Sequence, residues 1–435
     1  MERACAPFAG KRITVMGLGL LGRGVGDVEF LAECGAQILV TDKKSKRELA
    51  ESLARLKRFS NVEVRLGGHS LEDFTGADMV IKAAGVPLDS QEIAAAREHG
   101  VPVYMSTALF ARYALDAGAT LVGVTGTRGK TTTAQMIFHT LQKSGKRPHI
   151  GGNVRGKSTL AMLPDIHAGD IVVLELDSWQ LQGFGDLGIS PHVAVFTNLM
   201  PDHMNYYGGD RGRYFADKAN IFRFQKAGDS LFVGAALRQR IPVGIVPQPL
   251  GKEWKLRVLG GHNLENASFA AAALAALGLS ETEIRDGLES FEAVEGRLQF
   301  VREVRGVKIY NDNNATTPEA TIAALRALPG PITLIAGGSE KELALDELVR
   351  EIKGKNSSVV LLTHADYKGS ERLARILRRE SVAVLCAGSL EEALKKALSA
   401  AKTGTILFSP AFASFGMFKN EYERGDGFLR LVNTL

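Results

Sequence analysis

The chain has 435 residues, of which 45% are hydrophobic and 23% charged, with a formal net charge of +5 from 53 basic and 48 acidic side chains. This length suggests about three domains, and the composition is typical of a soluble globular protein. No apolar run reaches the roughly 18 residues that a membrane span needs, and the polar N-terminus lacks the apolar core of a secretion signal. We therefore expect a cytoplasmic protein with no membrane contact.

The small positive charge suits either a solvated surface or a cleft for anionic ligands such as nucleotides. Basic residues in ARILRRE (374–380) recur at helical spacing among apolar ones, which favours a helix surface over an arm that binds nucleic acid. The cysteines Cys5, Cys34 and Cys386 lie far apart without C-x-x-C spacing. This pattern predicts neither a zinc site nor a disulfide framework.

The first hundred residues alternate between strand-like and helix-like segments. The predicted strands are 12–19, 38–42 and 77–85, and helical periodicity covers 26–35 and 48–60. A series of this kind predicts a parallel sheet covered by helices.

Two further series follow, which makes the chain an α/β protein. The second has predicted strands at 119–126, 171–177 and 192–198 and an Ala-rich helix at 266–279, and the third has strands at 306–314, 331–338, 358–364, 382–388 and 404–410. We place the domain boundaries near residues 108 and 294, which predicts domains of 1–108, 109–294 and 295–435.

The segment GLGLLG (17–22) fits G-x-G-x-x-G between a predicted strand and a helix, and Asp42 follows Gly22 by twenty residues. Such glycines let the backbone approach a diphosphate at a helix N-terminus, while the acid binds ribose hydroxyls. The pattern is compatible with an NAD-dependent oxidoreductase and equally with a protein that binds a UDP-sugar. The alternative is a tight strand–helix turn without a ligand.

The segment GVTGTRGKTTT (123–133) resembles a phosphate-binding loop but misses the spacing G-x-x-x-x-G-K-[ST] by one residue. Backbone N–H groups of Gly126 to Lys130 are placed to wrap a phosphate chain at the start of a helix. Lys130 is expected to neutralise the terminal phosphates, and the Thr131 hydroxyl to bind Mg²⁺. The alternative is a glycine-rich turn with an exposed lysine.

Polar residues that suit a magnesium ion follow two later strands. Glu175 and Asp177 end the segment VVLELD, on the same side of the predicted strand, and Asp202 and His203 follow another strand. Taken alone, these are equally a solvated strand end and a histidine held in a turn. Asn263 and Asn266, which open the Ala-rich helix, suit either an N-cap or a base or sugar.

The order of GVTGTRGKTTT, LELDSWQL, DHMNYY, GHNLEN, GRLQFV and YNDNNATTPEAT resembles the Mur ligase family over the whole chain. These are ATP-dependent enzymes that add amino acids to the peptide of the bacterial cell-wall precursor. The extra residue in the loop is a feature of the family's own variant of the P-loop motif. The resemblance is greatest to the members that add D-glutamate to UDP-N-acetylmuramoyl-L-alanine. It implies Rossmann-like N- and C-terminal domains around a central P-loop ATPase-like domain, and a monomer.

The resemblance also implies roles for individual residues. Those assigned to ATP are Gly126, Thr127, Gly129, Lys130, Thr131 and Thr132 in the loop, Asn263 and Asn266 near the adenine, Asp312 at the ribose and Arg297 at the γ-phosphate. Those assigned to Mg²⁺ are Thr131, Glu175, His203 as a ligand rather than a base, and Lys218 as a carbamate formed with CO₂. Those assigned to the substrates are Leu20, Leu21, Asp42 and Lys43 for UDP, Asn153 for the muramoyl group, and Lys341, Ser414 and Tyr422 for D-glutamate. Lys130, His203, Lys218 and Arg297 carry the catalytic roles.

Several positions depart from the family's usual residues. Near ATP these are Arg128 for an asparagine, Asp177 for a serine and Asn205 for an aspartate. In the third domain they are Gln299 for an acid, Asn313-Asn314 for Ser-Lys and Glu421 for a phenylalanine. The loss of a lysine at 314 and of an aromatic ring at 421 bears on the identity of the incoming amino acid. The carboxylate of Glu421 is expected either to weaken D-glutamate binding or to favour a substrate that bears a cation.

Overall fold

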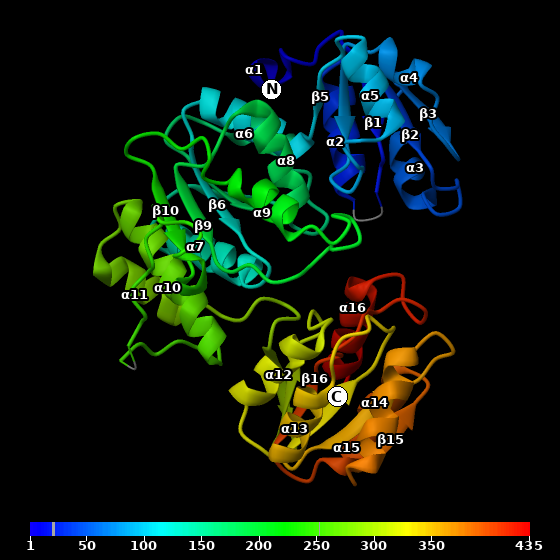
Figure 1. Ribbon diagram of the computed structural model, residues 1–435, viewed down its shortest axis with the longest axis vertical. Coiled ribbons are helices and arrows are strands. Elements are labelled where there is room, and N and C mark those ends of the chain that lie inside the picture. The colour runs from blue at the N-terminus through cyan, green and yellow to red at the C-terminus, as the bar shows by residue number, and fades with distance from the viewer. Residues whose placement is uncertain (20–21, 252) are drawn as a thin grey trace. The chain divides into compact units, whose positions relative to one another are not determined.

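The computed structural model describes residues 1–19, 22–251 and 253–435. The described residues form three β-sheets with helices packed beside them (Figure 1), which confirms the predicted three-domain α/β class. By their internal contacts they divide into two compact units. Unit 1 comprises Met1–Gln248 and Ala267–Gly287, and unit 2 comprises Pro249–Asn266 and Leu288–Leu435.

The first sheet of unit 1 is parallel, in the order β3-β2-β1-β4-β5. Its strands are β1 (Arg12–Met16), β2 (Gln37–Asp42), β3 (Val62–Leu66), β4 (Met79–Lys82) and β5 (Val103–Tyr104). The helices of this part are α1 (Glu2–Cys5), α2 (Arg23–Glu33), α3 (Ala50–Leu56), α4 (Glu72–Thr75), α5 (Gln91–Glu98) and α6 (Ser106–Asp116). The strand order reverses between β1 and β4, where parallel sheets of this kind bind ligands.

The second sheet of unit 1 is also parallel, in the order β10-β9-β6-β8-β7. Its strands are β6 (Thr120–Thr125), β7 (Pro148–Gly152), β8 (Ile171–Glu175), β9 (Val193–Phe196) and β10 (Ser230–Val233). Its helices are α7 (Lys130–Lys143), η1 (Leu160–Asp165), α8 (Ser178–Leu187), α9 (Arg211–Ala219) and η2 (Ala235–Leu237). The helices α10 (Gly261–Ala276) and α11 (Glu281–Ser290) each run from one unit into the other.

The sheet of unit 2 has the order β11-β12-β16-β13-β14-β15 and is parallel except for the pair β11 and β12. Its strands are β11 (Gln299–Val304), β12 (Val307–Asn311), β13 (Ile332–Ala336), β14 (Ser358–Leu362), β15 (Val384–Ala387) and β16 (Thr405–Phe408). Its helices are α12 (Pro318–Ala327), α13 (Asp346–Gly354), α14 (Lys368–Arg379), α15 (Leu390–Ala400) and α16 (Glu421–Asn433). The antiparallel β11 is absent from the sequence prediction.

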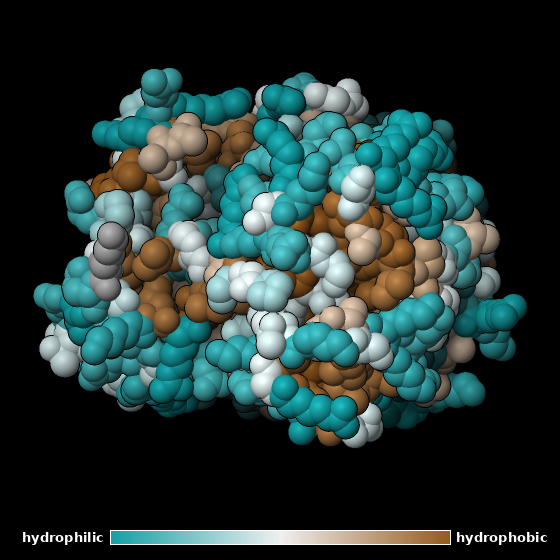
Figure 2. Space-filling model, turned by 90° about the horizontal axis from the view of Figure 1, so that it is seen from below, coloured by the Kyte–Doolittle hydropathy of each residue, from teal (hydrophilic) through white to brown (hydrophobic). Residues whose placement is uncertain are grey.

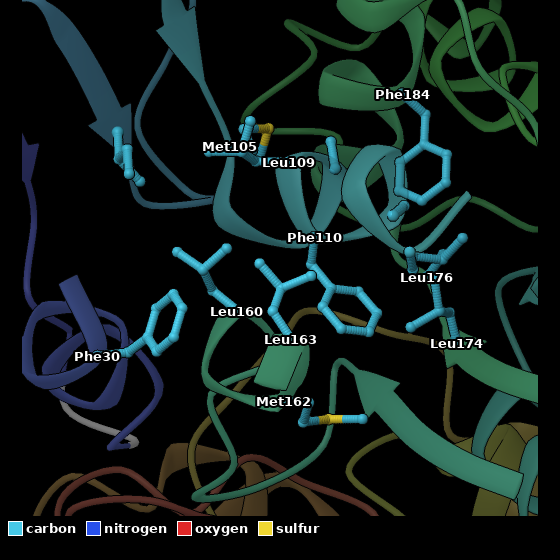
Figure 3. Close-up of a cluster of buried hydrophobic side chains, with 14 of the residues drawn as sticks. Phe30, Met105, Leu109, Phe110, Leu160, Met162, Leu163, Leu174, Leu176 and Phe184 are labelled. Carbon is cyan, nitrogen blue, oxygen red and sulfur yellow. The ribbon is translucent and has the colours of Figure 1, made fainter. Parts of the chain in front are cut away.

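One core joins the two sheets of unit 1. Figure 3 shows Phe110 of α6 among side chains of η1, β8 and α8, with Phe30 of α2 nearby. Because α6 follows the first sheet directly and packs against the second, it carries apolar contacts between them. On the face that Figure 2 shows, hydrophilic residues surround several separate groups of hydrophobic ones.

The predicted absence of a disulfide is wrong, because Cys5 and Cys34 are joined by one with a Cα–Cα distance of 4.8 Å. Cys5 ends α1 and Cys34 follows α2, so packing of these two helix ends brings together residues that are 29 apart in sequence. Cys386 is exposed and has a free thiol. None of the helices that the structure describes is long and apolar enough to cross a membrane.

A buried carboxyl group links α2 to the segment before η1. Ser158 Oγ donates to Asp27 Oδ1 at 2.5 Å, and Arg23, one helical turn before Asp27, donates from Nη1 to Asn153 Oδ1 at 2.7 Å. Burial raises the pKa of Asp27 to about 6, which the hydrogen bond from Ser158 only partly opposes.

We expect this group to make unit 1 less stable as the pH rises. In the folded chain Asp27 stays protonated up to about pH 6, whereas in the unfolded chain it ionises near its ordinary pKa of 3.8. The folded state therefore binds more protons within that window, and about 3 kcal/mol of stability is lost across it. Urea unfolding at several pH values should show a flatter pH dependence for Asp27→Asn than for the natural chain. Equal slopes in the two proteins would contradict this assignment.

Candidate functional site

A cavity of about 640 Å³ lies within unit 1, at the carboxyl ends of its strands. This volume is in the range of small-molecule sites. Six of the candidate residues from the sequence line it together, namely Asp42, Lys43, Lys130, Asn153, Asp177 and His203. The fold thus brings residues of both predicted segments, the GLGLLG turn and the GKT loop, around one cavity.

The GLGLLG turn stands at the end of β1, next to the point where the strand order reverses. Gly22, in a left-handed conformation, precedes the first residue of α2, as the motif requires. Asp42 Oδ2 accepts a hydrogen bond from Leu18 N at 2.8 Å, and Oδ1 accepts one from Lys44 N at 2.9 Å. Asp42 therefore orients the turn itself, in addition to lining the cavity. Leu20 and Leu21 lie outside the described residues.

The GKT loop connects β6 to α7, and its shape is held by the end of β9. Thr197 Oγ1 donates to Arg128 O at 2.6 Å, and Arg128 N donates to Asn198 Oδ1 at 2.9 Å. A Cβ on Gly126 would lie 1.9 Å from Thr197 Oγ1, so only glycine fits there. Lys130 Nζ donates to the loop carbonyls of Gly126 and Thr127 at 3.1 and 3.3 Å. The ammonium group therefore lies over the loop that the sequence assigns to phosphates.

Lys218, in α9, is almost completely buried beneath the same loop. Its Nζ donates to Gly126 O at 2.9 Å and to Thr125 Oγ1 at 3.3 Å, and lies 5.1 Å from the Tyr214 ring centre. Burial, reinforced by the charge of Lys130, holds the pKa of Lys218 well below its ordinary value, while nearby carboxylates oppose the shift. A lowered pKa favours the uncharged amine that addition of CO₂ requires.

The residues assigned to magnesium offer few ligands of their own. Glu175 is buried at the end of β8, and Thr131 is half-buried in the first turn of α7. Within the described ranges, no three His, Cys, Asp or Glu side chains come close enough to hold a metal ion. This donor set still fits Mg²⁺, which usually takes one or two carboxylates, water and substrate phosphates rather than a cage built by the protein alone.

His203 sits in a turn with a left-handed backbone (φ 54°), and its ring lies 4.4 Å from that of Trp179, centre to centre. Burial lowers the pKa of His203, and the charge of Asp202 opposes this shift. The neutral ring that results is the form of histidine that binds metals.

Asp177 lies beyond the end of β8 and forms the N-cap of α8, so the expectation that it shares a strand face with Glu175 is wrong. Its Oδ1 accepts from Gln180 N at 2.8 Å, and its backbone N–H donates to Gln180 Oε1 at 3.2 Å. This capping box explains why an aspartate is tolerated where the family usually has serine.

The sequence analysis missed several residues that line the cavity, including Arg23, Lys82 and Trp179. Lys82 ends β4 and donates from Nζ to Val86 O at 2.9 Å, and burial lowers its pKa to about 8. A lysine at the end of a buried strand, in ADMVIKAAG, was the available signal. Trp179 gave a weaker one, since aromatic residues near strand ends are usually part of a core.

Three of the predicted residues of unit 2 follow the carboxyl ends of parallel strands: Asp312 after β12, Ser414 after β16 and Lys341 after β13. Asp312 Oδ2 accepts from Ser409 Oγ at 2.8 Å and Oδ1 from Leu298 N at 3.0 Å, and burial raises the pKa of Asp312 to about 7. Arg297 is exposed next to Leu298, and its charge lowers that pKa.

Two asparagines lie in the first turns of α10. Asn263 Nδ2 donates to Leu259 O at 2.8 Å, and Asn266 Nδ2 donates to Asn263 Oδ1 at 3.1 Å. Both side chains are buried, so they stabilise this turn whether or not they also meet a base.

The three residues assigned to D-glutamate lie on neighbouring segments. Lys341 Nζ donates to Thr316 Oγ1 at 3.3 Å, and Ser414 O accepts from Tyr367 Oη at 3.1 Å. Tyr422 is half-buried in the first turn of α16.

Family models match most of the chain. They are the Mur ligase MurD-like N-terminal domain over residues 11–105, the Mur ligase middle domain over 124–239 and the Mur ligase glutamate ligase domain over 296–412. Among curated proteins, the chain is 36% identical to the UDP-N-acetylmuramoylalanine–D-glutamate ligase of Roseiflexus sp., over 98% of this chain and 99% of that protein. The ligase of the same name from Clostridium kluyveri is 33% identical, over 98% and 97%.

Solved structures share the fold. UDP-N-acetylmuramate-alanine ligase MurC from Thermotoga maritima aligns with a TM-score of 0.64 at 20% identity, covering 98% of this chain and 99% of that one. The MurF ligase from the same organism, solved in complex with ADP, aligns with a TM-score of 0.60 at 19% identity, covering 91% and 94%. From the whole-length identity to curated relatives and the three family models, the chain belongs to the Mur ligase family.

Proposed function

We propose that this protein joins D-glutamate to UDP-N-acetylmuramoyl-L-alanine at the expense of ATP, in the synthesis of the peptidoglycan precursor. The observation that carries the proposal is the cavity of about 640 Å³ in unit 1, which is lined both by residues of the GLGLLG turn and by Lys130 of the GKT loop. The names of the Roseiflexus and Clostridium relatives support the choice of substrates.

The proposed reaction has two steps. A carboxylate oxygen of the substrate's terminal alanine attacks the γ-phosphorus of ATP, the bond from that phosphorus to the bridging oxygen breaks, and ADP leaves. The amine of D-glutamate then attacks the carbonyl carbon of the acyl phosphate, loses a proton and expels phosphate. Both steps depend chiefly on positioning and on stabilising charge.

On this proposal the residues act as follows. The backbone amides from Gly126 to Gly129 and the ammonium of Lys130 hold the phosphates of ATP, and Arg297 stabilises charge on the γ-phosphate. Bound Mg²⁺ neutralises phosphate charge, and Thr131, Glu175, His203 and carbamylated Lys218 are the residues that would hold it. Asn263, Asn266 and Asp312 are assigned to the nucleoside.

The remaining assignments concern the other two substrates. Asp42 and Lys43 are proposed to bind the UDP group, and Asn153, which Arg23 orients, the muramoyl group. Lys341 and Ser414 are proposed to bind the carboxylates of D-glutamate, beside Tyr422. A monomeric state, a cytoplasmic location and the domain boundaries at 108 and 294 stay predictions.

The test is phosphate release from Mg-ATP in the presence of UDP-N-acetylmuramoyl-L-alanine and one amino acid at a time. The panel is D-glutamate, D-aspartate, L-lysine and diaminopimelate. We expect release that depends on D-glutamate. Release that depends on another amino acid would keep the mechanism and refute the proposed specificity, whereas binding of NAD without binding of ATP would refute the ligase activity itself.

A further inference from the structure

Unit 2 contains a completely buried arginine that has no ionic partner among the described residues. Arg424 lies in the first turn of α16 with 0% of its surface exposed. Its Nε donates to Asn313 Oδ1 at 2.8 Å, its Nη2 to Asn313 O at 3.0 Å and its Nη1 to Phe412 O at 3.2 Å. Burial lowers the pKa of Arg424 to about 10, so the group still carries its charge at neutral pH.

These hydrogen bonds tie two loops to one helix. Asn313 follows β12 and Phe412 follows β16, and the two strands are parallel neighbours, so both loops leave the sheet at the same edge. Asn313 Nδ2 in turn donates to Glu421 O at 2.6 Å, which returns the network to α16. A Cβ on Gly425 would lie 2.8 Å from Asn313 Nδ2, so the helix approaches the loop as closely as a glycine permits.

A third loop joins the same edge, after the parallel strand β13. Ser339 N donates to Ala413 O at 3.0 Å, next to Phe412. Lys341 stands two residues later, and its Nζ donates to Thr316 Oγ1 of the loop after β12. The segments that carry Lys341 and Ser414 are therefore both bound to segments that Arg424 holds.

A buried cation that only neutral oxygens surround produces a positive potential in its neighbourhood, because few nearby charges offset it. Glu421, half-buried at the start of α16, acts on Arg424 through space but forms no ion pair with it within the described residues. The crevice at the carboxyl ends of such strands is where parallel sheets bind ligands. An acidic ligand would gain from this potential, and a neutral one of the same shape would not.

We propose that Arg424 and Asn313 are positioning residues for the amino-acid subsite, and that the buried charge of Arg424 selects a dicarboxylic amino acid over its neutral isostere. The inference rests on the proposed ligase function and adds a source of specificity to it. It also offers a reason why asparagine at 314, where the family usually has lysine, is compatible with an acidic substrate.

The test compares D-glutamate with D-glutamine in three variants. Asn313→Asp places a carboxylate against the guanidinium and cancels its charge with almost no change in shape, although it also removes the hydrogen bond from Asn313 Nδ2 to Glu421 O. Arg424→Lys keeps the charge and loses part of the hydrogen bonding. Asn433→Asp adds the same negative charge at the other end of α16, about 14 Å from Arg424 along the helix, and serves as the matched control.

For Asn313→Asp we expect the KM for D-glutamate to rise about tenfold, the KM for ATP to stay unchanged, and the preference for D-glutamate over D-glutamine in kcat/KM to fall about tenfold. Arg424→Lys should keep that preference within about threefold even where kcat falls, and Asn433→Asp should match the natural chain. Thermal unfolding of each variant verifies that it is folded. If Asn313→Asp does not fold, the inference is tested by the ratio of kcat/KM values for D-glutamate and D-glutamine in Arg424→Lys.

The inference is overturned if folded Asn313→Asp keeps the natural preference, or if folded Arg424→Lys loses it. A rise in the KM values for ATP and D-glutamate together would show a merely structural role and would also overturn it. Failure of the proposed function can be distinguished from failure of this inference, because the first appears in the assay of the natural chain and the second only in the variants. Phosphate release that requires a neutral or basic amino acid refutes the selection of an acidic amino acid. Absence of phosphate release with every amino acid refutes both proposals.

Discussion

Replacing Lys130 with alanine is expected to reduce phosphate release by at least roughly 10³-fold, because the charge that develops on the phosphates during transfer then lacks the ammonium group of the loop. Lys130 Nζ already lies over the loop carbonyls of Gly126 and Thr127, so little rearrangement is needed for it to meet a phosphate. The measurement is single-turnover formation of ADP with both other substrates saturating, which separates chemistry from binding.

The matched control for this variant is Lys143→Ala. Lys143 lies at the other end of the same helix, where its Nζ donates to Asp286 O on the surface. We expect its rate to stay within about twofold of the natural chain, since surface substitutions have small effects. Equal losses in the two variants would show that damage to α7, and not loss of the phosphate contact, caused the effect.

Replacing Lys218 with alanine is the second large effect that we expect, with a loss of activity of about 10²- to 10³-fold. Carbamylation converts the amine into an anion, which can then bind a cation beside Thr131 and Glu175. Removal of the side chain leaves a space beneath the GKT loop that a small carboxylic acid can enter. Formate or acetate should therefore restore part of the activity of Lys218→Ala.

The matched control is Lys226→Ala, because Lys226 is an exposed lysine that follows α9. This variant should neither lose activity nor respond to acetate. A direct readout uses ¹³C-labelled bicarbonate, which should give a carbamate resonance in the natural chain and none in Lys218→Ala. Absence of that resonance in an active natural protein would refute the carbamate. Because deprotonation of the amine must precede addition of CO₂, the low pKa of Lys218 favours its formation at neutral pH.

The phosphate loop shows how much a local pattern predicts. Gly126, Gly129 and Lys130 stand at a junction of strand and helix, and the structure has β6 ending at Thr125 and α7 beginning at Lys130. Glycine spacing, a buried apolar run and a following helix all act over about ten residues, so the sequence alone suffices. The same holds for the GLGLLG turn between β1 and α2.

The disulfide and the antiparallel strand β11 are two features that local sequence patterns did not predict. Cys5 and Cys34 carry no spacing signal, and only the packing of α1 against the end of α2 brings them together. The strand β11 pairs with β12 through a tight turn at Arg305 and Gly306. Its residues are exposed or half-buried, so it lacks the continuous apolar run of the parallel strands. The disulfide depends on a contact across the fold, whereas the hairpin is local and was missed because β11 lacks an apolar pattern.

The sequence by itself determined the α/β class, the strand–loop–helix junction at the GKT loop and, through resemblance, the family, because each depends on the order and spacing of short segments. Only the tertiary structure shows that Lys218 is buried against the GKT loop, and that Asp27 is hydrogen-bonded to Ser158. It also shows that Arg424 lies between Asn313 and Phe412, with no counter-ion among the described residues. Asn313 and Arg424 are 111 residues apart. The charge and pKa of such groups depend on what surrounds them in space, and separation along the chain carries no information about that.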